Sequence, residues 1–314
     1  MKKILSLMVC LLATITAAQA ASTQKCLLQH QGTVKLFDAD NITGAISAAV
    51  DGDTLYLTAG EFPGFTISKK ITVRGAGTAT KITGDVTVNI AGTPTLTQTL
   101  LEGVDLSSSS TDVVLSSAMK GVKLKQCSMS KLYTNANNSD VIIDRCRISE
   151  ELCFSDSYIK SMTVLNSDIN NIGYSYSSTK NIINFINCNI CFYVPSYVAG
   201  TFVNCSITKY SGTSSSYQTI ANCSFVNCLF QWDASSYFAS STTSQQCYFD
   251  ATCDWDAATF ESLGYMGNDG RVVGLMGGAT PYTLELAVPK VTESQISLDP
   301  ETRVLNVNIK VSAK

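Results

Sequence analysis

Charged side chains are sparse in this 314-residue chain, and one cluster of them combines residue types that can transfer protons. Charged residues make up 15% of the chain, against roughly 25% in an average soluble domain. Asp144 and Arg147 lie close together, and Asp168 follows 21 residues after Arg147. Carboxylates beside an arginine could act as acid and base in the cleavage of an acidic polysaccharide. The same residues also fit a solvated surface of alternating charge, so we assign no catalytic residue and leave enzymatic activity open.

Aromatic side chains in the same half of the chain point to binding rather than to chemistry. Exposed rings on a long, flat face are suited to stacking against sugars. Rings of this kind can equally pack over the corners of a fold, and the sequence does not separate the two interpretations. Their number, with few charges nearby, favours contact with a polysaccharide or a cell-surface glycan over catalysis. The candidate ligand-binding residues are Tyr174, Tyr176, Tyr193, Tyr197, Tyr210 and Trp232.

The sequence predicts no metal site and no cofactor, although Ca²⁺ is left open. The lone CxxC motif that begins at Cys188 lacks the second ligand pair that a zinc site needs. Asp250, Asp254 and Asp256 offer carboxylates that Ca²⁺ could bind, but helix capping already accounts for Asp254. His30 is the only histidine, and we expect it to be an exposed residue ahead of the first element rather than a general base.

These residues lie in a repeat that returns about every twenty residues. Each copy reads polar, small, any, hydrophobic, and most copies have another apolar residue three positions before the small one. Successive small positions are separated by 19, 21, 21, 17, 23 and 19 residues. A short period that tolerates changes in loop length is typical of stacked coils. The small positions are Cys127, Cys146, Ser167, Cys188, Cys205, Cys228 and Cys247.

The repeat predicts a single-stranded right-handed parallel β-helix, an all-β solenoid of roughly ten coils. Apolar residues two positions apart share one face of a strand, and no helical stripe of apolar residues competes with this pattern. Stacked coils would form a rod on the order of 45 Å long. We expect the cysteines to point inward as mostly free thiols. We also expect Asn166, Asn187, Asn204 and Asn227 to form a ladder in which each amide bonds to its copies above and below.

Both ends of the rod need caps, because an open coil leaves unpaired backbone groups. A helix over 41–50, with Asp40 or Asn41 as its N-cap, would cover the first coil. A second short helix is predicted over 254–264. Strands Ser294–Leu298 and Val304–Val311 follow in a tail that would cover the last coil or offer a strand to a partner, and we favour the cover. The predicted divisions are a signal peptide (1–20), the capped β-helix (21–266) and the β tail (267–314).

The first twenty residues have the pattern of a secretory signal. Two lysines precede a short apolar run that ends in Ala18-Gln19-Ala20, which predicts cleavage after Ala20. Removing Lys2 and Lys3 leaves 20 basic residues against 25 acidic ones, a net charge of about −5. This charge argues against nucleic acid as a partner. We expect an exported chain without a transmembrane segment, located in the periplasm, at the cell surface or outside the cell.

The opening of the chain resembles the pectin-lyase-like right-handed parallel β-helix superfamily. Ala48 to Phe62 contains Gly-Asp-Thr followed by alternating apolar residues, and Ile71 to Gly77 reads Ile-Thr-Val-Arg-Gly-Ala-Gly. The end of the chain, Val273 to Tyr282, is similar to uncharacterised secreted β-helix proteins of Gram-negative bacteria. The resemblance implies a fold shared by lyases, hydrolases, adhesins and phage tailspikes, so it implies little about activity.

The enzymes of this superfamily use motifs that the chain lacks. Its lyases hold Ca²⁺ with several carboxylates, and its hydrolases use clustered Asp residues in Asn-Thr-Asp, Asp-Asp, Gly-His-Gly and Arg-Ile-Lys signatures. None of these signatures occurs here. The sequence therefore favours a non-catalytic, surface-associated or secreted protein that is adhesin-like or binds carbohydrate. The alternative is a polysaccharide lyase or glycoside hydrolase that acts on an acidic polysaccharide at Asp144, Arg147 and Asp168.

Overall fold

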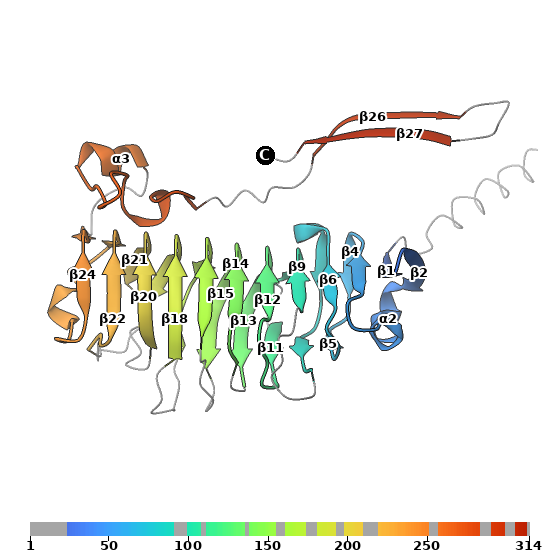
Figure 1. Ribbon diagram of the computed structural model, residues 1–314, viewed down its shortest axis with the longest axis horizontal. Coiled ribbons are helices and arrows are strands. Elements are labelled where there is room, and N and C mark those ends of the chain that lie inside the picture. The colour runs from blue at the N-terminus through green and yellow to red at the C-terminus, as the bar shows by residue number, and fades with distance from the viewer. Residues whose placement is uncertain are drawn as a thin grey trace, which may run out of the picture.

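Two long parallel sheets, stacked strand by strand along one axis, form a β-helical rod (Figure 1). The computed structural model describes residues 24–90, 99–107, 111–135, 138–154, 161–173, 181–192, 198–209, 219–250, 257–282, 290–298 and 305–312. The chain passes from one sheet to the other in every coil, so strands that are neighbours in a sheet are separated in sequence by one coil. This arrangement confirms the predicted all-β solenoid of parallel strands.

The first sheet, here called sheet A, contains twelve strands in the order β2-β1-β3-β6-β9-β12-β14-β16-β18-β20-β22-β24. Its first two strands are antiparallel, and the other ten run parallel to one another. The bounds of the strands are β1 Lys25–His30, β2 Thr33–Asp38, β3 Thr54–Leu57, β6 Thr72–Arg74, β9 Leu100–Glu102, β12 Lys123–Lys125, β14 Val141–Asp144, β16 Met162–Leu165, β18 Asn181–Ile186, β20 Val198–Val203, β22 Cys223–Val226 and β24 Thr243–Gln245.

The second sheet, sheet B, contains thirteen strands that pack against sheet A across the core. Near its N-terminal end this sheet divides into two rows, in which β5, β8 and β11 pair separately and rejoin at β13. The strands are β4 Gly60–Phe62, β5 Phe65–Ile67, β7 Thr80–Ile82, β8 Val86–Val88, β10 Asp105–Leu106, β11 Asp112–Leu115, β13 Ser128–Thr134, β15 Arg147–Phe154, β17 Asp168–Ile169, β19 Asn189–Phe192, β21 Ser206–Lys209, β23 Leu229–Phe230 and β25 Tyr248–Phe249.

A helix and a hairpin cover the N-terminal coil. Helix α2 (Ile42–Ala48) buries Ile42, Ala45 and Ile46 against the core, as its apolar stripe predicts. A 3-10 turn, η1 (Ala39–Asn41), precedes it. Asn41 is the N-cap of α2, as one of the two predicted residues, although its side chain makes no capping hydrogen bond. The hairpin β1–β2 extends sheet A by two antiparallel strands, which the sequence analysis did not predict.

The polar residue of each repeat forms the bend between the two sheets. Its backbone is left-handed in every coil, with φ between 46° and 54° from Gln126 to Gln246. Asparagine tolerates this conformation better than other residues with a side chain because its short amide can bond locally. The small residue that follows turns inward, and its thiol donates to the carbonyl two residues earlier, as Cys188 does to Ile186 at 3.3 Å. All ten cysteines in the described residues are free, as predicted.

Like residues stack on one another inside the rod because the coils are in register. The rings of Phe185, Phe202 and Phe225 form a column with centroid separations of 4.9 and 4.6 Å. Phe238 continues the column at 5.4 Å from Phe225. Each ring of the three is fully buried. Stacked aromatic rings add to the free energy gained from burying their surface, so this column stabilises the C-terminal half of the rod.

After the last coil the chain turns back along the outside of the bends. Short helix α3 (Ala257–Ser262) and turn η4 (Gly274–Met276) flank this return, and Phe260 and Val273 pack on Leu229. The predicted N-cap of α3, Asp254, lies outside the described residues. We call residues 265–282 the strap. Figure 1 shows it running beside the strand ends of the last coils rather than over the final strand β24.

The asparagines of the bends bind the strap instead of one another. Asn227 and Asn268 exchange two hydrogen bonds of 3.0 Å, through Nδ2 of Asn227 and the backbone N–H of Asn268. Asn187 Nδ2 donates to the Gly277 carbonyl at 2.7 Å. Among the described residues no hydrogen bond joins the side chains of Asn166, Asn187, Asn204 and Asn227, so the predicted amide ladder is wrong. The hydrogen bonds to the strap come from the amides of Asn187 and Asn227.

The remaining described elements lie at turns and in the tail. Turns η2 (Gly77–Ala79) and η3 (Ser235–Tyr237) lie within coils. Strands β26 (Lys290–Leu298) and β27 (Leu305–Ser312) pair with each other in antiparallel register, at the predicted positions. Sheet A ends at β24, which pairs with β22 alone. Within the described residues β26 and β27 pair only with each other, and the favoured prediction that the tail covers the last coil stays a prediction.

Asn227 has two roles: its amide binds the strap, and its backbone adopts the left-handed conformation of the bend. Two substitutions separate these roles, because glycine adopts the left-handed conformation readily and alanine does not. Asn227→Gly should cost about 1–3 kcal/mol, since it leaves polar groups of the strap without partners. Asn227→Ala should cost about 1–2 kcal/mol more, because a Cβ disfavours positive φ. Urea unfolding of the three proteins measures both differences. Equal stabilities of the glycine variant and the unaltered protein would contradict the strap contact.

Candidate functional site

Arg147 and Asp168 of the predicted charged patch do meet in the structure. They are in register on neighbouring strands β15 and β17, and Arg147 Nε lies 3.8 Å from Asp168 Oδ2. The Arg147 side chain is 66% exposed. Asp168 also accepts a hydrogen bond of 3.0 Å from Asn189 Nδ2 on the next strand. An exposed ion pair of this kind contributes little to the free energy of unfolding. The two partners of the Asp168 carboxylate, Arg147 and Asn189, lie on the strands to either side of β17.

Asp144 lies on the other side of the bend, at the end of β14 in sheet A. Its carboxylate is mostly buried and forms ion pairs with Lys123 at 3.9 Å and with Arg145 at 4.0 Å. Among the described residues no ion pair or hydrogen bond connects Asp144 with Arg147 or Asp168. The three candidates are therefore neighbours across one corner of the rod, but they do not form a single interacting cluster.

Tyr282, at the end of the strap, lies near the charged pair. Burial raises the pKa of its hydroxyl well above the ordinary range, and the negative charge of Asp168 raises it further. The thiol of Cys188 acts in the same direction, while Arg147 opposes it. The strap therefore brings a neutral phenol to the corner where Arg147 and Asp168 stand. Sequence reasoning missed this approach, because residues so distant in the chain show no common spacing.

The aromatic candidates are described only in part. Tyr174, Tyr176, Tyr193, Tyr197 and Tyr210 lie outside the described residues. Trp232 is half-buried against the core, and its ring meets the edge of Phe230 at a centroid distance of 5.6 Å. Its indole N–H is buried without a hydrogen-bond partner among the described residues. Trp232 therefore contributes to packing, which was the other interpretation of these rings.

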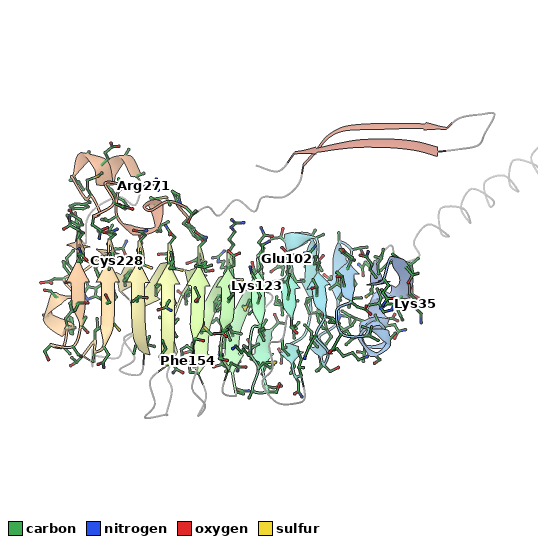
Figure 2. All side chains as sticks on the ribbon, in the orientation of Figure 1. Lys35, Glu102, Lys123, Phe154, Cys228 and Arg271 are labelled. Carbon is green, nitrogen blue, oxygen red and sulfur yellow. The ribbon has the colours of Figure 1, made fainter. Side chains whose placement is uncertain are left out.

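The outer face of sheet A changes character along the rod. Toward the N-terminus it carries a charged ladder, in which Arg74 and Lys125 flank Glu102 at 3.0 and 2.7 Å. Lys123 extends this charged region to Asp144 at 3.9 Å. Figure 2 shows Glu102 and Lys123 on this half of the rod. From β16 onward, charged residues are absent from the corresponding described positions of the sheet.

Two uncharged rows replace the charged ladder on the C-terminal half of sheet A. In the first row, Thr201 donates to the Asn184 amide oxygen at 2.7 Å, and Thr243 donates to Ser224 at 3.1 Å. The second row is apolar and half-buried. The first row, here called the hydroxyl row, is Thr163, Asn184, Thr201, Ser224 and Thr243; the second, the apolar row, is Leu165, Ile186, Val203 and Val226.

These two rows form the best candidate binding surface among the described residues. Thr201 and Thr243 are exposed, and Ile182 at the edge of the face is 49% exposed. Parallel strands place equivalent side chains roughly 4.8 Å apart along the rod. The surface therefore repeats one hydrogen-bonding group and one apolar group in each coil from β16 to β22, and β24 adds Thr243. The sequence analysis predicted aromatic contacts for a polysaccharide and did not identify these rows of Ser, Thr and Asn.

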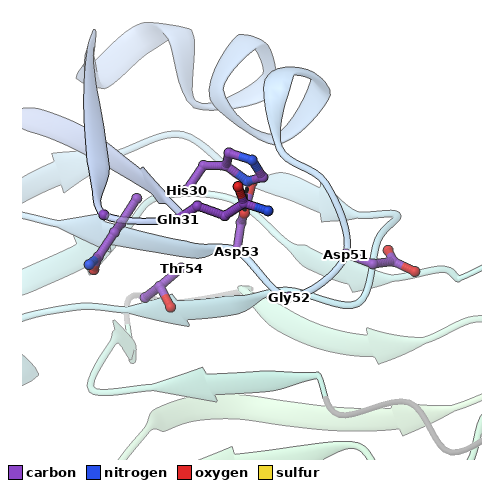
Figure 3. Close-up of a pocket in the computed structure, with 8 residues that line it drawn as sticks. His30, Gln31, Asp51, Gly52, Asp53 and Thr54 are labelled. Carbon is purple, nitrogen blue, oxygen red and sulfur yellow. Dashed lines mark hydrogen bonds and ion pairs between the residues drawn. The ribbon is translucent and has the colours of Figure 1, made fainter.

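A polar pocket of about 460 Å³ lies at the N-terminal cap, where the β1–β2 turn meets the turn before β3 (Figure 3). His30 Nδ1 lies 2.6 Å from Asp53 Oδ1. The other oxygen of Asp53 accepts the Val50 N–H at 2.9 Å. The pocket lining is Gln29, His30, Gln31, Gly32, Asp51, Gly52, Asp53 and Thr54. The predicted exposed histidine is thus half-exposed and paired with a buried carboxylate.

Asp53 is held in its charged form although it is buried. Burial by itself would raise the pKa of this carboxyl, but hydrogen bonds from Val50 and His30 hold the pKa below its ordinary value. The positive charges of His30 and Lys69 act in the same direction. The carboxylate fixes the turn before β3 and orients the imidazole through Nδ1. Asp53 therefore braces the turn before β3, and Arg74 pairs with Glu102.

The described residues contain no group of three or more His, Cys, Asp or Glu side chains that could hold a metal ion. Asp250, one of the Ca²⁺ candidates, accepts a hydrogen bond of 2.7 Å from the Tyr265 hydroxyl. Asp254 and Asp256 lie outside the described residues. Within the same described part of the chain, no helix has the length and apolar character to cross a membrane.

Asp53→Asn should remove a contribution to stability that depends on pH. The lowered pKa means that the charged carboxylate stabilises the folded state above the unfolded pKa of about 3.9, and that this contribution is lost as the pH falls through the folded pKa. Urea unfolding between pH 5 and pH 2 should show a constant difference between the two proteins near pH 5 that shrinks toward pH 2. A difference that does not change with pH would contradict a charged Asp53.

Comparisons of this chain with protein-family models, with curated proteins and with solved structures found no match. The assignment of the fold therefore rests on the strand pairing of the protein itself, which is that of a parallel β-helix.

Proposed function

We propose that this protein is an exported, non-catalytic β-helix that binds an extended polysaccharide, as a surface-associated or secreted adhesin-like protein. The observation that carries the proposal is the pair of uncharged rows on sheet A. An extended polymer needs a long surface with a regular repeat, and the rows supply one set of groups per coil.

The chemistry of the two rows suits a sugar chain. Hydroxyl and amide groups such as those of Asn184 and Thr201 can both donate to and accept from sugar hydroxyls. The apolar row beside them offers a surface for the C–H faces of sugar rings. Neither row carries a charge, so binding would not depend on an acidic or basic ligand. The partner we infer is therefore a polysaccharide or cell-surface glycan with uncharged hydroxyl-rich segments.

The predicted location and the predicted tyrosines support the same proposal. The signal-peptide pattern of residues 1–20 directs the chain out of the cytoplasm, toward the periplasm, the cell surface or the exterior. Tyr174, Tyr176, Tyr193, Tyr197 and Tyr210 remain proposed contacts for sugars. We also propose that the chain belongs to the pectin-lyase-like superfamily, near secreted β-helix proteins of Gram-negative bacteria, on the opening motifs of its sequence.

An enzymatic alternative is favoured by one observation, the meeting of Arg147 and Asp168 next to Asp144 at a single corner of the rod. An arginine beside a carboxylate could act on a uronate in a lyase or hydrolase, with Ca²⁺ as a cofactor. Asp144→Asn, Arg147→Gln and Asp168→Asn should abolish cleavage in that case. Under the proposal made here these substitutions leave polysaccharide binding within about twofold.

The proposal predicts that removing the polar groups of the hydroxyl row weakens binding. Asn184→Ala combined with Thr201→Val should raise the dissociation constant at least tenfold on any polysaccharide that retains the unaltered protein, since two or more hydrogen bonds are lost. Affinity electrophoresis in gels that contain plant, host or bacterial polysaccharides measures the change.

A matched substitution on another sheet serves as the control. Thr66→Val changes an exposed residue of β5 in sheet B, and its binding should remain unchanged. Tyr174→Ala with Tyr176→Ala tests the aromatic contacts in the same gels. Unchanged migration of the Asn184/Thr201 variant on every retaining polysaccharide would exclude the hydroxyl row as the binding surface, whatever the tyrosine variants show.

A further inference from the structure

Among the described residues, the first strand of sheet A is an open edge with an apolar surface beside it. Strand β2 pairs with β1 on one side, and sheet A ends there. Every residue of β2 is exposed except Phe37, which is half-buried. Val34 and Leu36 are 58% and 64% exposed. Natural proteins usually protect such edges with charges, proline or a covering segment, because an open strand pairs readily with another chain.

The apolar surface extends across three strands. Leu36 of β2, Leu27 of β1 and Tyr56 of β3 are directly opposite one another in the sheet. Tyr56 is 37% exposed and Leu27 is half-buried. Together with Val34 they form a continuous patch on the outer face of the cap. Scattered single apolar residues need no explanation, whereas a contiguous patch next to an open strand marks an interaction site.

The hairpin geometry determines which backbone groups of β2 are free. His30 and Thr33 flank a two-residue turn in which Gln31 and Gly32 both have positive φ, and such turns close on a hydrogen-bonded pair. Hydrogen-bonded pairs then alternate along the hairpin. Thr33, Lys35 and Phe37 therefore direct their N–H and C=O groups toward β1. Val34 and Leu36 direct theirs toward the open edge, and so does the Asp38 N–H, whereas the Asp38 carbonyl accepts from the Cys26 thiol at 3.9 Å.

We propose that β2 pairs with β2 of a second copy of this chain, in antiparallel register with Leu36 opposite Leu36 on a two-fold axis. Leu36 then faces Leu36 of the second copy, and the Asp38 N–H of each copy faces the Val34 carbonyl of the other. A partner strand of this kind satisfies both backbone groups of Leu36, the Val34 carbonyl and the Asp38 N–H. Antiparallel pairing of one strand with itself is the isologous arrangement of a two-fold dimer.

The side chains favour this register over the neighbouring antiparallel registers, in which the two-fold axis lies one residue away and the outer faces of the two copies still point the same way. With Leu36 on the axis, Lys35 lies opposite Phe37 of the second copy, and within one chain the Lys35 ammonium already lies 4.9 Å from the Phe37 ring centroid. Moving the two-fold axis to Lys35 would place Lys35 opposite Lys35, and like charges directly opposite destabilise a strand pair. That register would also leave Asp38 unpaired across the interface. Moving the axis to Phe37 would place Val34 opposite Asp40, which lies in the turn η1 rather than in a strand.

The pairing would join the two copies of sheet A into one continuous sheet. Because opposite residues of a strand pair lie on the same face, the outer faces of both copies would point in the same direction. The dimer does not depend on the proposed function. If the proposed function holds, the hydroxyl rows of the two copies would lie in one line, and each copy could contact the same polysaccharide chain. Linked contacts raise overall affinity without new chemistry at either one.

Sedimentation equilibrium of the exported chain tests the dimer directly. The unaltered protein should show a concentration-dependent dimer mass. Leu36→Lys should weaken the dimer at least tenfold, because it places a charge opposite its own copy. Leu36→Pro should do the same without disturbing the hairpin, since the Leu36 N–H faces the open edge, where proline is tolerated. Ile182→Lys, at an exposed position on the far half of the sheet, should leave the dimer intact.

Cysteine cross-linking tests the register. Residues in a hydrogen-bonded antiparallel pair have Cα atoms about 5.5 Å apart, a separation that a disulfide spans. Under a mild oxidant, Leu36→Cys should form a covalent dimer, and Ile182→Cys should not. A monomeric unaltered protein at about 100 µM, or a dimer that survives both Leu36→Lys and Leu36→Pro, would overturn the proposal. A dimer weakened by these changes that forms no Leu36→Cys cross-link would overturn its register.

Discussion

The left-handed bend in each coil is the constraint on which the rest of the structure depends. At this bend the polar residue of each repeat adopts positive φ, and its N–H bonds to the next coil, as Asn187 does to the Val203 carbonyl and Asn204 to the Val226 carbonyl, both at 3.0 Å. These bonds keep every bend directly above the last. Because the bends are in register, the strands on either side are in register too. Loops elsewhere in the coil can then differ in length without disturbing the stack.

Register at the bend gives every position of the repeat its own row along the rod. Inward positions produce the columns of cysteines and phenylalanines, in which each side chain contacts a copy of itself. Outward positions produce the charged ladder of Arg74, Glu102 and Lys125 and the uncharged rows that begin at β16. A ligand that repeats along one direction meets the same groups in each coil. The proposed function follows from this property more than from any single residue.

The sequence predicts the repeated features well because repetition multiplies a weak local signal. The coils, the inward cysteines and the helix α2 follow from spacing and from apolar periodicity. The partners of the bend asparagines could not be predicted in this way. Asn187 and Gly277 are 90 residues apart, and nothing in the spacing of either segment indicates the hydrogen bond between them. The sequence analysis therefore predicted that the bend asparagines bond to one another, because the repeat contains no sign of the strap that binds Asn187.

In the candidate site too, contacts between neighbouring coils could be predicted from the repeat, and other contacts could not. The sequence brought Arg147 and Asp168 together correctly because a separation of one coil places residues side by side in the stack. It did not place Asp144 on the far side of the bend, since a single residue in left-handed conformation reverses the direction of the chain. The pocket at His30 and Asp53 depends on the β1–β2 hairpin. Its turn at Gln31-Gly32 was the signal that could have revealed it.

The measurement that tests the central claim most directly is the chain length of polysaccharides after incubation with the exported protein, with and without Ca²⁺. A panel of plant, host and bacterial polysaccharides should include at least one that retains the protein. The account predicts that the retained polymer keeps its full length under both conditions. Shortened chains, with loss of the shortening in Arg147→Gln, would contradict it and identify the corner at Arg147 and Asp168 as an active site.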